Sequence, residues 1–317
     1  MGASAAILPV TLFEPIEISN KGDDALTVKR PSERSIAELE ELSAHTRELI
    51  LRSVFNAGAG HIGGPLSVSD ILINLYFDRI HIDPSEPHFR DRDRVILSKG
   101  HSSIALYTVL AMRGYFPVEE LDTFDAIDSR LQGHPCMKTL PGVDMSTGSL
   151  GQGLSPGVGM ALGAKHAGLD FHTWVILGDG EIQEGQIWEA CFVAARFGLG
   201  NLTVILDYNK LPQFGWPSEE GYSRSRFLDD PAAKFAAFGW ATLECDGHDH
   251  ASLRAAFDEA EAATTQPVAI IADTIKGKGV SFMEANHNWH AKVPTQQELD
   301  DAVSELSSRS LVGVGPA

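Results

Sequence analysis

Two apolar runs that each end at a polar side chain, with a helix-like stretch between them, constrain the fold of this chain more than any other feature. The first run covers residues 173–177 and is followed two positions later by Asp179. The second covers residues 202–208 and ends directly before Asn209, and the intervening residues 186–197 have helical periodicity. This order predicts a βαβ unit in a mostly parallel sheet. We therefore expect Asp179 and Asn209 to lie together at the carboxyl edge of the sheet, where α/β proteins bind ligands.

The residue types at these strand ends suit a divalent cation that carries a diphosphate. Mg²⁺ takes oxygen ligands at about 2.0–2.1 Å and usually only one or two protein side chains beside phosphate oxygens and water. Asp179 supplies charge and Asn209 a neutral carbonyl oxygen, while Gly178 and Gly180 leave room for the backbone to approach phosphates at a helix N-terminus. No Walker lysine and no Gly-x-Gly-x-x-Gly follow here, which disfavours a nucleotide loop. A simple turn in which the aspartate caps the helix is the plainer interpretation.

The spacing of these residues resembles the thiamine diphosphate signature, Gly-Asp-Gly followed after nearly thirty residues by Asn. The wider chain resembles the N-terminal half of a transketolase, but only its diphosphate-binding domain. Six blocks match in family order: residues 60–65, 97–101, 133–135, 147–153, 276–279 and 289–290. The resemblance implies an α/β thiamine diphosphate-binding fold with a mostly parallel sheet flanked by helices. We expect this domain at residues 35–306, after an N-terminal extension (1–34) and before a short tail (307–317).

Four histidines lie in glycine- or proline-flanked loops of these blocks, namely His61, His101, His134 and His290. A neutral imidazole can accept a hydroxyl proton near pH 7 and return it later. The resemblance implies that His101 meets the diphosphate and the reacting centre, and that His134 binds the terminal hydroxyl of the substrate. It implies proton transfer for His61 and His290, and a place beside the cofactor for His290. Taken singly, each histidine has a structural interpretation, and no Cys or His spacing indicates zinc.

Further cofactor contacts follow from the resemblance alone. Gly148 and Leu150 are expected to touch the aminopyrimidine ring, and Leu211 to offer its backbone carbonyl oxygen to Mg²⁺. Glu184, and with less support Glu189, are expected to face a partner domain and hydrogen-bond toward the glutamate that activates the cofactor. Both carboxylates also fit an ordinary role in the first turns of a helix, where negative charge is favoured.

The resemblance implies a transketolase, which transfers a two-carbon ketol unit from a ketose phosphate to an aldose phosphate. Full-length members carry a second, pyrimidine-binding domain, and this chain continues for only 27 residues after His290. We therefore expect the N-terminal subunit of a split transketolase, active with a separately encoded C-terminal subunit in a two-plus-two heterotetramer. The glycine-rich stretch at 148–164 predicts close backbone approach, either at that contact or between helix and sheet.

Three alternatives remain from the sequence. One is another thiamine diphosphate enzyme, such as deoxyxylulose phosphate synthase or the α subunit of a 2-oxoacid dehydrogenase. Another is a non-catalytic regulatory subunit, which the metal-ligand types at Asp179 and Asn209 disfavour. The last is a Mg²⁺-nucleotide-binding protein, which the missing Walker lysine disfavours.

Composition narrows the choice of partners and compartment. The formal net charge of −18 disfavours nucleic acid and anionic membrane surfaces, although a local site can still bind sugar phosphates. No apolar run approaches the roughly 20 residues that span a bilayer. The cysteines Cys136, Cys191 and Cys245 are odd in number and lack metal-ligand spacing, so they are expected to be reduced thiols. We expect a cytoplasmic enzyme.

Overall fold

A five-stranded parallel sheet organises the structure, a computed structural model that describes residues 34–212, 216–218, 221–223 and 230–312. The strand order is β1-β2-β3-β7-β6, and each neighbouring pair in this sheet is parallel. The strands are β1 (Arg94–Leu97), β2 (Thr173–Gly178), β3 (Leu202–Tyr208), β6 (Ala241–Asp246) and β7 (Val268–Asp273). The predicted α/β class with a mostly parallel sheet is confirmed. The expected extension lies, apart from Arg34, outside the described residues.

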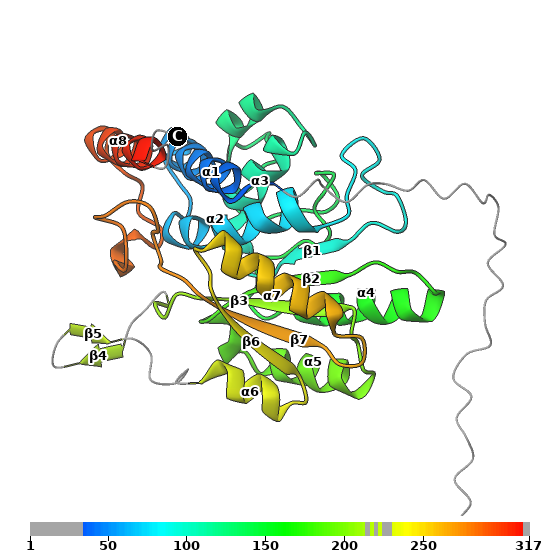
Figure 1. The fold of residues 1–317 in the computed structure, drawn as a ribbon. Helices are drawn as coiled ribbons and strands as arrows, with labels where there is room; N and C mark the ends of the chain where they lie inside the picture. The colour runs from blue at the N-terminus through cyan, green and yellow to red at the C-terminus, as the bar shows by residue number, and fades with distance from the viewer. Residues whose placement is uncertain (1–33, 213–215, 219–220, 224–229, 313–317) are drawn as a thin grey trace, which may run out of the picture.

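Helices cover both faces of the sheet (Figure 1). One layer contains α1 (Ile36–Ala57), α2 (Gly63–Asn74), α3 (Ser103–Met112) and α7 (His250–Ala262). The other contains α4 (Leu154–Ala167), α5 (Gly185–Arg196) and α6 (Pro231–Ala237). Alternate residues of β2 enter the two cores: Trp174 and Ile176 face the first layer, while Val175 and Leu177 face the second. Burial on both faces explains why the strands are almost continuously apolar in sequence.

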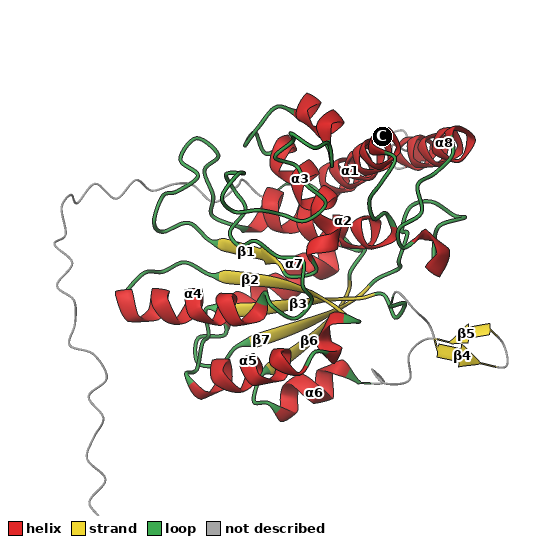
Figure 2. Cartoon of the chain, turned by 180° about the vertical axis from the view of Figure 1, so that it is seen from behind, coloured by secondary structure: helices red, strands yellow, loops and turns green. Residues whose placement is uncertain are grey.

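A capping box begins α1. The Ser35 hydroxyl accepts from the backbone N–H of Glu38, and the Glu38 carboxylate accepts from the backbone N–H of Ser35. Gly58, with a left-handed φ of 64°, ends the helix. Helix α8 (Gln296–Val312) lies beside α1 and runs through residue 306, the expected end of the domain (Figure 2).

Helix α2 begins earlier than the sequence pattern predicts, and this difference shapes the site. The pattern predicts a helix from about Ser67, but α2 starts at Gly63 and continues into a π-helical turn at Leu75–Arg79. A Cβ atom at Gly63 would lie 3.0 Å from the carbonyl oxygen of Trp289, so the missing side chain permits the close approach. Pro65 lies in the first turn of α2, where proline is tolerated because its missing N–H needs no partner. The first turn of α2 therefore reaches the carboxyl edge of the sheet.

The connections beyond that edge differ in length. Residues 98–102 follow β1, the Gly-Asp-Gly turn follows β2, and a long connection with the hairpin β4 (Trp216–Ser218) and β5 (Gly221–Ser223) follows β3. Within the described ranges, no helix combines the length and apolarity that crossing a membrane requires.

Candidate active site

A cavity of about 230 Å³ opens at the carboxyl edge of the sheet, where the loops after β1, β2, β3 and β7 converge. Every residue expected at the site from the sequence lines this cavity, with the exception of Glu184 and Glu189. Those residues are His61, His101, His134, Gly148, Leu150, Gly178, Asp179, Gly180, Asn209, Leu211 and His290. The structure thus brings together side chains that are up to 229 positions apart in the sequence (61 to 290).

The oxygen atoms expected for a metal ion lie at one end of the cavity. Asp179 is 3% exposed, and its two carboxylate oxygens accept the backbone N–H groups of Gly180 at 2.7 Å and Lys210 at 2.5 Å. Burial raises the pKa of Asp179 to about 6, and the nearby Asp207 carboxylate contributes to this rise. The Asn209 side-chain oxygen accepts the N–H of Leu211 at 3.1 Å. A buried carboxylate, an amide oxygen and a backbone carbonyl form the hard-oxygen donor set that Mg²⁺ takes, so these residues fit the ion.

Two buried lysines bring positive charge to the same cavity. Lys99 is 2% exposed and Lys276 is 3% exposed, in a chain whose net charge is strongly negative. Lys99 forms an ion pair with the fully buried Asp207, and its ammonium also donates to the carbonyl oxygen of Gly64 at 3.2 Å. Burial lowers the pKa of Lys276 to about 8, which leaves it mostly protonated at pH 7. This charge suits the phosphates of a metal-bound diphosphate.

Three of the four predicted histidines form a cluster on the other side of the cavity. The ring centroid of His61 lies 5.1 Å from those of both His101 and His290, which are 5.5 Å apart. Burial lowers the pKa of all three imidazoles, to about 2 for His101 and about 3 for His290. The lysine cations Lys99 and Lys276 contribute to the low pKa of His101 and His290. The cluster is therefore neutral at pH 7, as exchange of protons with a bound hydroxyl requires.

His134 is exposed and stands against the glycine-rich loop. A Cβ atom at Gly148 would lie 3.0 Å from the His134 ring, so the absence of a side chain there makes room for the imidazole. A Cβ atom at Gly100 would lie 2.7 Å from the Gly148 nitrogen, so two backbone segments also meet closely at this point. Close packing within the chain therefore accounts for these glycines.

Lys276 connects the metal end of the cavity to the histidine cluster. Its ammonium donates to the Leu211 carbonyl oxygen at 2.9 Å and lies 2.7 Å from Nδ1 of His290. A protonated lysine has no acceptor, so Nδ1 of His290 accepts this hydrogen bond and Nε2 carries the ring proton. The sequence alone does not indicate this role, because a lysine near the end of a strand is usually a surface charge.

Glu181 is a buried site residue that the sequence analysis missed. It is 1% exposed and accepts hydrogen bonds from the Ser98 hydroxyl, the Gly151 N–H at 2.8 Å and the Gly178 N–H at 3.0 Å. Its carboxylate thus fastens the turn after β2 to the loop after β1 and to the glycine-rich loop. The position of Glu181 directly after Gly-Asp-Gly could have indicated a site residue, because a charged residue there lies at the carboxyl edge of the sheet.

Glu184 lies outside the cavity lining. It is exposed at the residue before α5, and Glu189 is exposed one and a half turns into that helix. A Cβ atom at Gly151 would lie 2.8 Å from Cβ of Glu184, so the base of this side chain lies next to the glycine-rich loop. Both carboxylates lie at the surface of the chain, and their expected contact with a partner stays a prediction.

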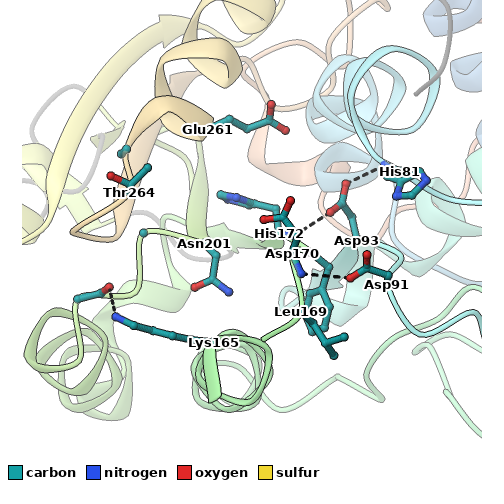
Figure 3. A pocket seen from close by; sticks show the side chains of 14 residues that line it. His81, Asp91, Asp93, Lys165, Leu169, Asp170, His172, Asn201, Glu261 and Thr264 are labelled. Carbon is teal, nitrogen blue, oxygen red and sulfur yellow. Dashed lines mark hydrogen bonds between the residues drawn. The ribbon is translucent and has the colours of Figure 1, made fainter. Parts of the chain in front are cut away.

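A larger cavity, of about 550 Å³, lies at the opposite edge, among the amino ends of the strands (Figure 3). Asp93 there accepts the backbone N–H groups of His81 at 2.7 Å and His172 at 2.8 Å. Asp91 accepts the backbone N–H of Asp170 at 3.2 Å. These carboxylates hold neighbouring segments of backbone together, which is a structural role. None of the sequence-predicted site residues lines this cavity.

The fold and the cavity define an α/β domain with a diphosphate-type site at the carboxyl ends of its strands. Residues 39–308 match the family described as transketolase, thiamine diphosphate binding domain, and the chain belongs to this family. It is 40% identical over 274 residues to an apulose-4-phosphate transketolase subunit of Phocaeicola vulgatus, covering 86% of this chain and 95% of that protein. It is 42% identical over 275 residues to a 6-deoxy-6-sulfo-D-fructose transketolase subunit of Clostridium sp., covering 87% and 98%.

Solved transketolase structures agree with the fold. The enzyme of Campylobacter jejuni has a TM-score of 0.78 and 32% sequence identity, covering 85% of this chain and 43% of that one. The enzyme of Leishmania mexicana has a TM-score of 0.80 at 28% identity, covering 87% and 42%. The chain therefore spans about two fifths of these solved transketolases. The predicted family and the thiamine diphosphate-binding fold are confirmed.

Proposed function

We propose that this chain is the N-terminal, thiamine diphosphate-binding subunit of a two-subunit transketolase. In this proposal it transfers a two-carbon ketol unit from a ketose phosphate to an aldose phosphate, together with a separately encoded C-terminal subunit. The observation that carries the proposal is the single cavity that joins the Asp179, Asn209 and Leu211 oxygens to a neutral histidine cluster. A non-catalytic regulatory subunit would need neither the metal-ligand oxygens nor the histidine cluster. Four histidines in one cavity favour sugar transfer over the reactions of other thiamine diphosphate enzymes.

At the metal end, the carboxylate of Asp179, the side-chain oxygen of Asn209 and the carbonyl oxygen of Leu211 would hold Mg²⁺. Lys276 would add positive charge toward the diphosphate, and Gly178 and Gly180 would let the backbone approach it. When bound, thiamine diphosphate supplies the electron sink that cleavage of a carbon–carbon bond beside a carbonyl requires. The protein residues supply position, charge and protons.

At the other end, the histidines would manage protons on the sugar. Burial lowers the pKa of His61 and His290, so both imidazoles are neutral at pH 7. A neutral imidazole can exchange a proton with the hydroxyl and carbonyl oxygens of the substrate. His101 adjoins both rings and borders the space for the diphosphate. His134, exposed at the rim, would hold the terminal hydroxyl of the sugar.

The proposed partner rests on the relatives of matching length. The two relatives that this chain covers almost completely are named as transketolase subunits, and single-chain transketolases are more than twice as long as the matched part. The exposed Leu150 at the cavity and the exposed carboxylates Glu184 and Glu189 support a contact beside the cofactor. We propose a pyrimidine-binding partner subunit in a two-plus-two heterotetramer. We also propose a cytoplasmic enzyme, because Cys136, Cys191 and Cys245 are all unpaired.

Reconstitution tests the proposal. The purified chain, the C-terminal subunit and their mixture are assayed with Mg²⁺ and thiamine diphosphate, using xylulose 5-phosphate as donor and ribose 5-phosphate as acceptor. The donor panel includes apulose 4-phosphate and 6-deoxy-6-sulfofructose, because relatives are named for these sugars. Activity is expected only in the mixture, and Asp179→Ala in the mixture serves as the control without a metal site. Full activity of the chain alone would refute the two-subunit proposal, and an inactive mixture with every donor would refute the transketolase assignment.

A further inference from the structure

A fully buried carboxylate lies directly behind the proposed metal site without lining the cavity. Asp207, near the carboxyl end of β3, is 0% exposed. It accepts hydrogen bonds from the Ser67 hydroxyl at 2.5 Å and from the Thr274 hydroxyl, and it forms the ion pair with Lys99. These three donors come from α2, from the residue after β7 and from the loop after β1. Asp207 therefore ties three neighbouring segments to the end of β3, two residues before Asn209.

Ser67 connects this carboxylate to the Asn209 side chain. The Asn209 amide nitrogen donates to the Ser67 hydroxyl oxygen at 3.4 Å, and the Ser67 hydroxyl donates its one proton to Asp207. Because the amide nitrogen is committed to Ser67, the amide oxygen of Asn209 faces the opposite way, where it accepts the Leu211 N–H at 3.1 Å. The orientation of this amide is thus set by two hydrogen bonds, one on each side.

We propose that Ser67 and Asp207 are positioning residues that hold the Asn209 amide with its oxygen turned toward the metal. This inference rests on the proposed Mg²⁺ site. Ser67 is 0% exposed, so its hydroxyl has no contact with bulk solvent in the folded chain. An alanine there leaves the Asn209 amide free to rotate and leaves Asp207 with one donor fewer. Partners that orient metal ligands typically affect metal affinity by about 10–100-fold.

The same helix offers a matched control. Ser69 is also 0% exposed, but its hydroxyl donates to the Pro65 carbonyl oxygen at 2.9 Å within α2. Ser69→Ala therefore removes a buried hydroxyl from the same helix without touching Asn209. If Ser67 contributed only to stability, Ser67→Ala would lower the thermal midpoint of the metal-free chain, as is expected of Ser69→Ala, and would leave metal affinity unchanged.

The experiment measures Mn²⁺ binding to the full chain mixed with its C-terminal subunit and saturating thiamine diphosphate, from the electron paramagnetic resonance signal of free Mn²⁺. Mn²⁺ is the probe because it takes the same oxygen ligands as Mg²⁺. Ser67→Ala is expected to weaken Mn²⁺ binding by about 10–100-fold, whereas Ser69→Ala should bind like the wild type. Ser67→Cys, nearly the same size but a weak hydrogen-bonding partner, replaces Ser67→Ala if circular dichroism shows that the alanine variant does not fold.

The outcomes separate this inference from the function on which it rests. Wild-type affinity in the Ser67 variant, with a bound metal in the wild type, would reject the positioning role and leave the metal site intact. Absence of Mn²⁺ binding by the wild-type chain mixed with its C-terminal subunit would reject the metal site and the positioning role together. Equal losses for the Ser67 and Ser69 variants would assign both hydroxyls to the stability of α2 and overturn the inference.

Discussion

Lys99→Met is the substitution whose effect on stability follows most directly from the structure. It removes the cation from an ion pair in which Lys99 is 2% exposed and Asp207 is 0% exposed. The Asp207 carboxylate keeps its two hydroxyl donors, Ser67 and Thr274, but loses the cation that it contacts directly, in a buried site. Breaking one side of a buried pair typically costs about 3–5 kcal/mol of unfolding free energy. We expect a loss in this range, because two remaining hydrogen bonds do not replace a cation.

Urea denaturation of the cofactor-free chain measures this loss. The double variant Lys99→Met/Asp207→Asn removes both charges and should recover at least half of it, since no unpaired ion remains. Lys292→Met is the matched control, because it breaks an exposed pair with Glu298 and a contact with the Trp289 ring. That variant should lose under about 2 kcal/mol. A Lys99→Met loss no larger than the Lys292→Met loss would refute the reasoning.

Three further predictions concern the cavity. Asp179→Ala should abolish Mg²⁺-dependent binding of thiamine diphosphate with the fold intact, and unchanged affinity in calorimetry would reject the metal assignment. His134→Ala and His290→Ala should each lower turnover of the reconstituted enzyme by about 10²–10⁴-fold. Near-normal rates in both variants would contradict a role in proton transfer and leave both residues with structural roles. The folded pKa of His101, about 2, lies below its ordinary value of 6.5, so its stabilisation is full above pH 6.5 and lost as the pH falls. By pH 5 the loss is about 2 kcal/mol, and His101→Gln should flatten the pH dependence of urea unfolding in this range.

The sheet and the metal end of the site could be predicted because their signals are local. The strands β2 and β3 occur where the apolar runs at 173–177 and 202–208 predict them, since apolar runs of that length between polar turns have few other structures. The carboxyl ends of adjacent parallel strands must share one edge. Asp179 and Asn209 therefore meet in the cavity as a consequence of strand order alone.

The partners behind the site could not be predicted in the same way. Ser67 and Asp207 are 140 positions apart, and Lys99 and Asp207 are 108 apart. No periodicity relates such residues, because their contact depends on where α2 begins over the sheet edge. The predicted start of α2 was wrong by about four residues, because Gly63 and Gly64 are weak helix formers. Glycine is present there because neighbouring segments approach closely, which is visible only in the fold.

The protonation states of the site residues could not be predicted from the sequence either. The residue type of His290 indicates a group that titrates near pH 6.5, yet burial and the neighbouring Lys276 cation hold its pKa at about 3. The same lysine has its pKa lowered by burial and donates to the one ring nitrogen that it can reach. In the proposed function, a histidine that accepts a proton must be neutral before substrate binds. Burial is the main cause of the low pKa values of His101 and His290, and the cations Lys99 and Lys276, to which the sequence motifs assign no role, lower them further.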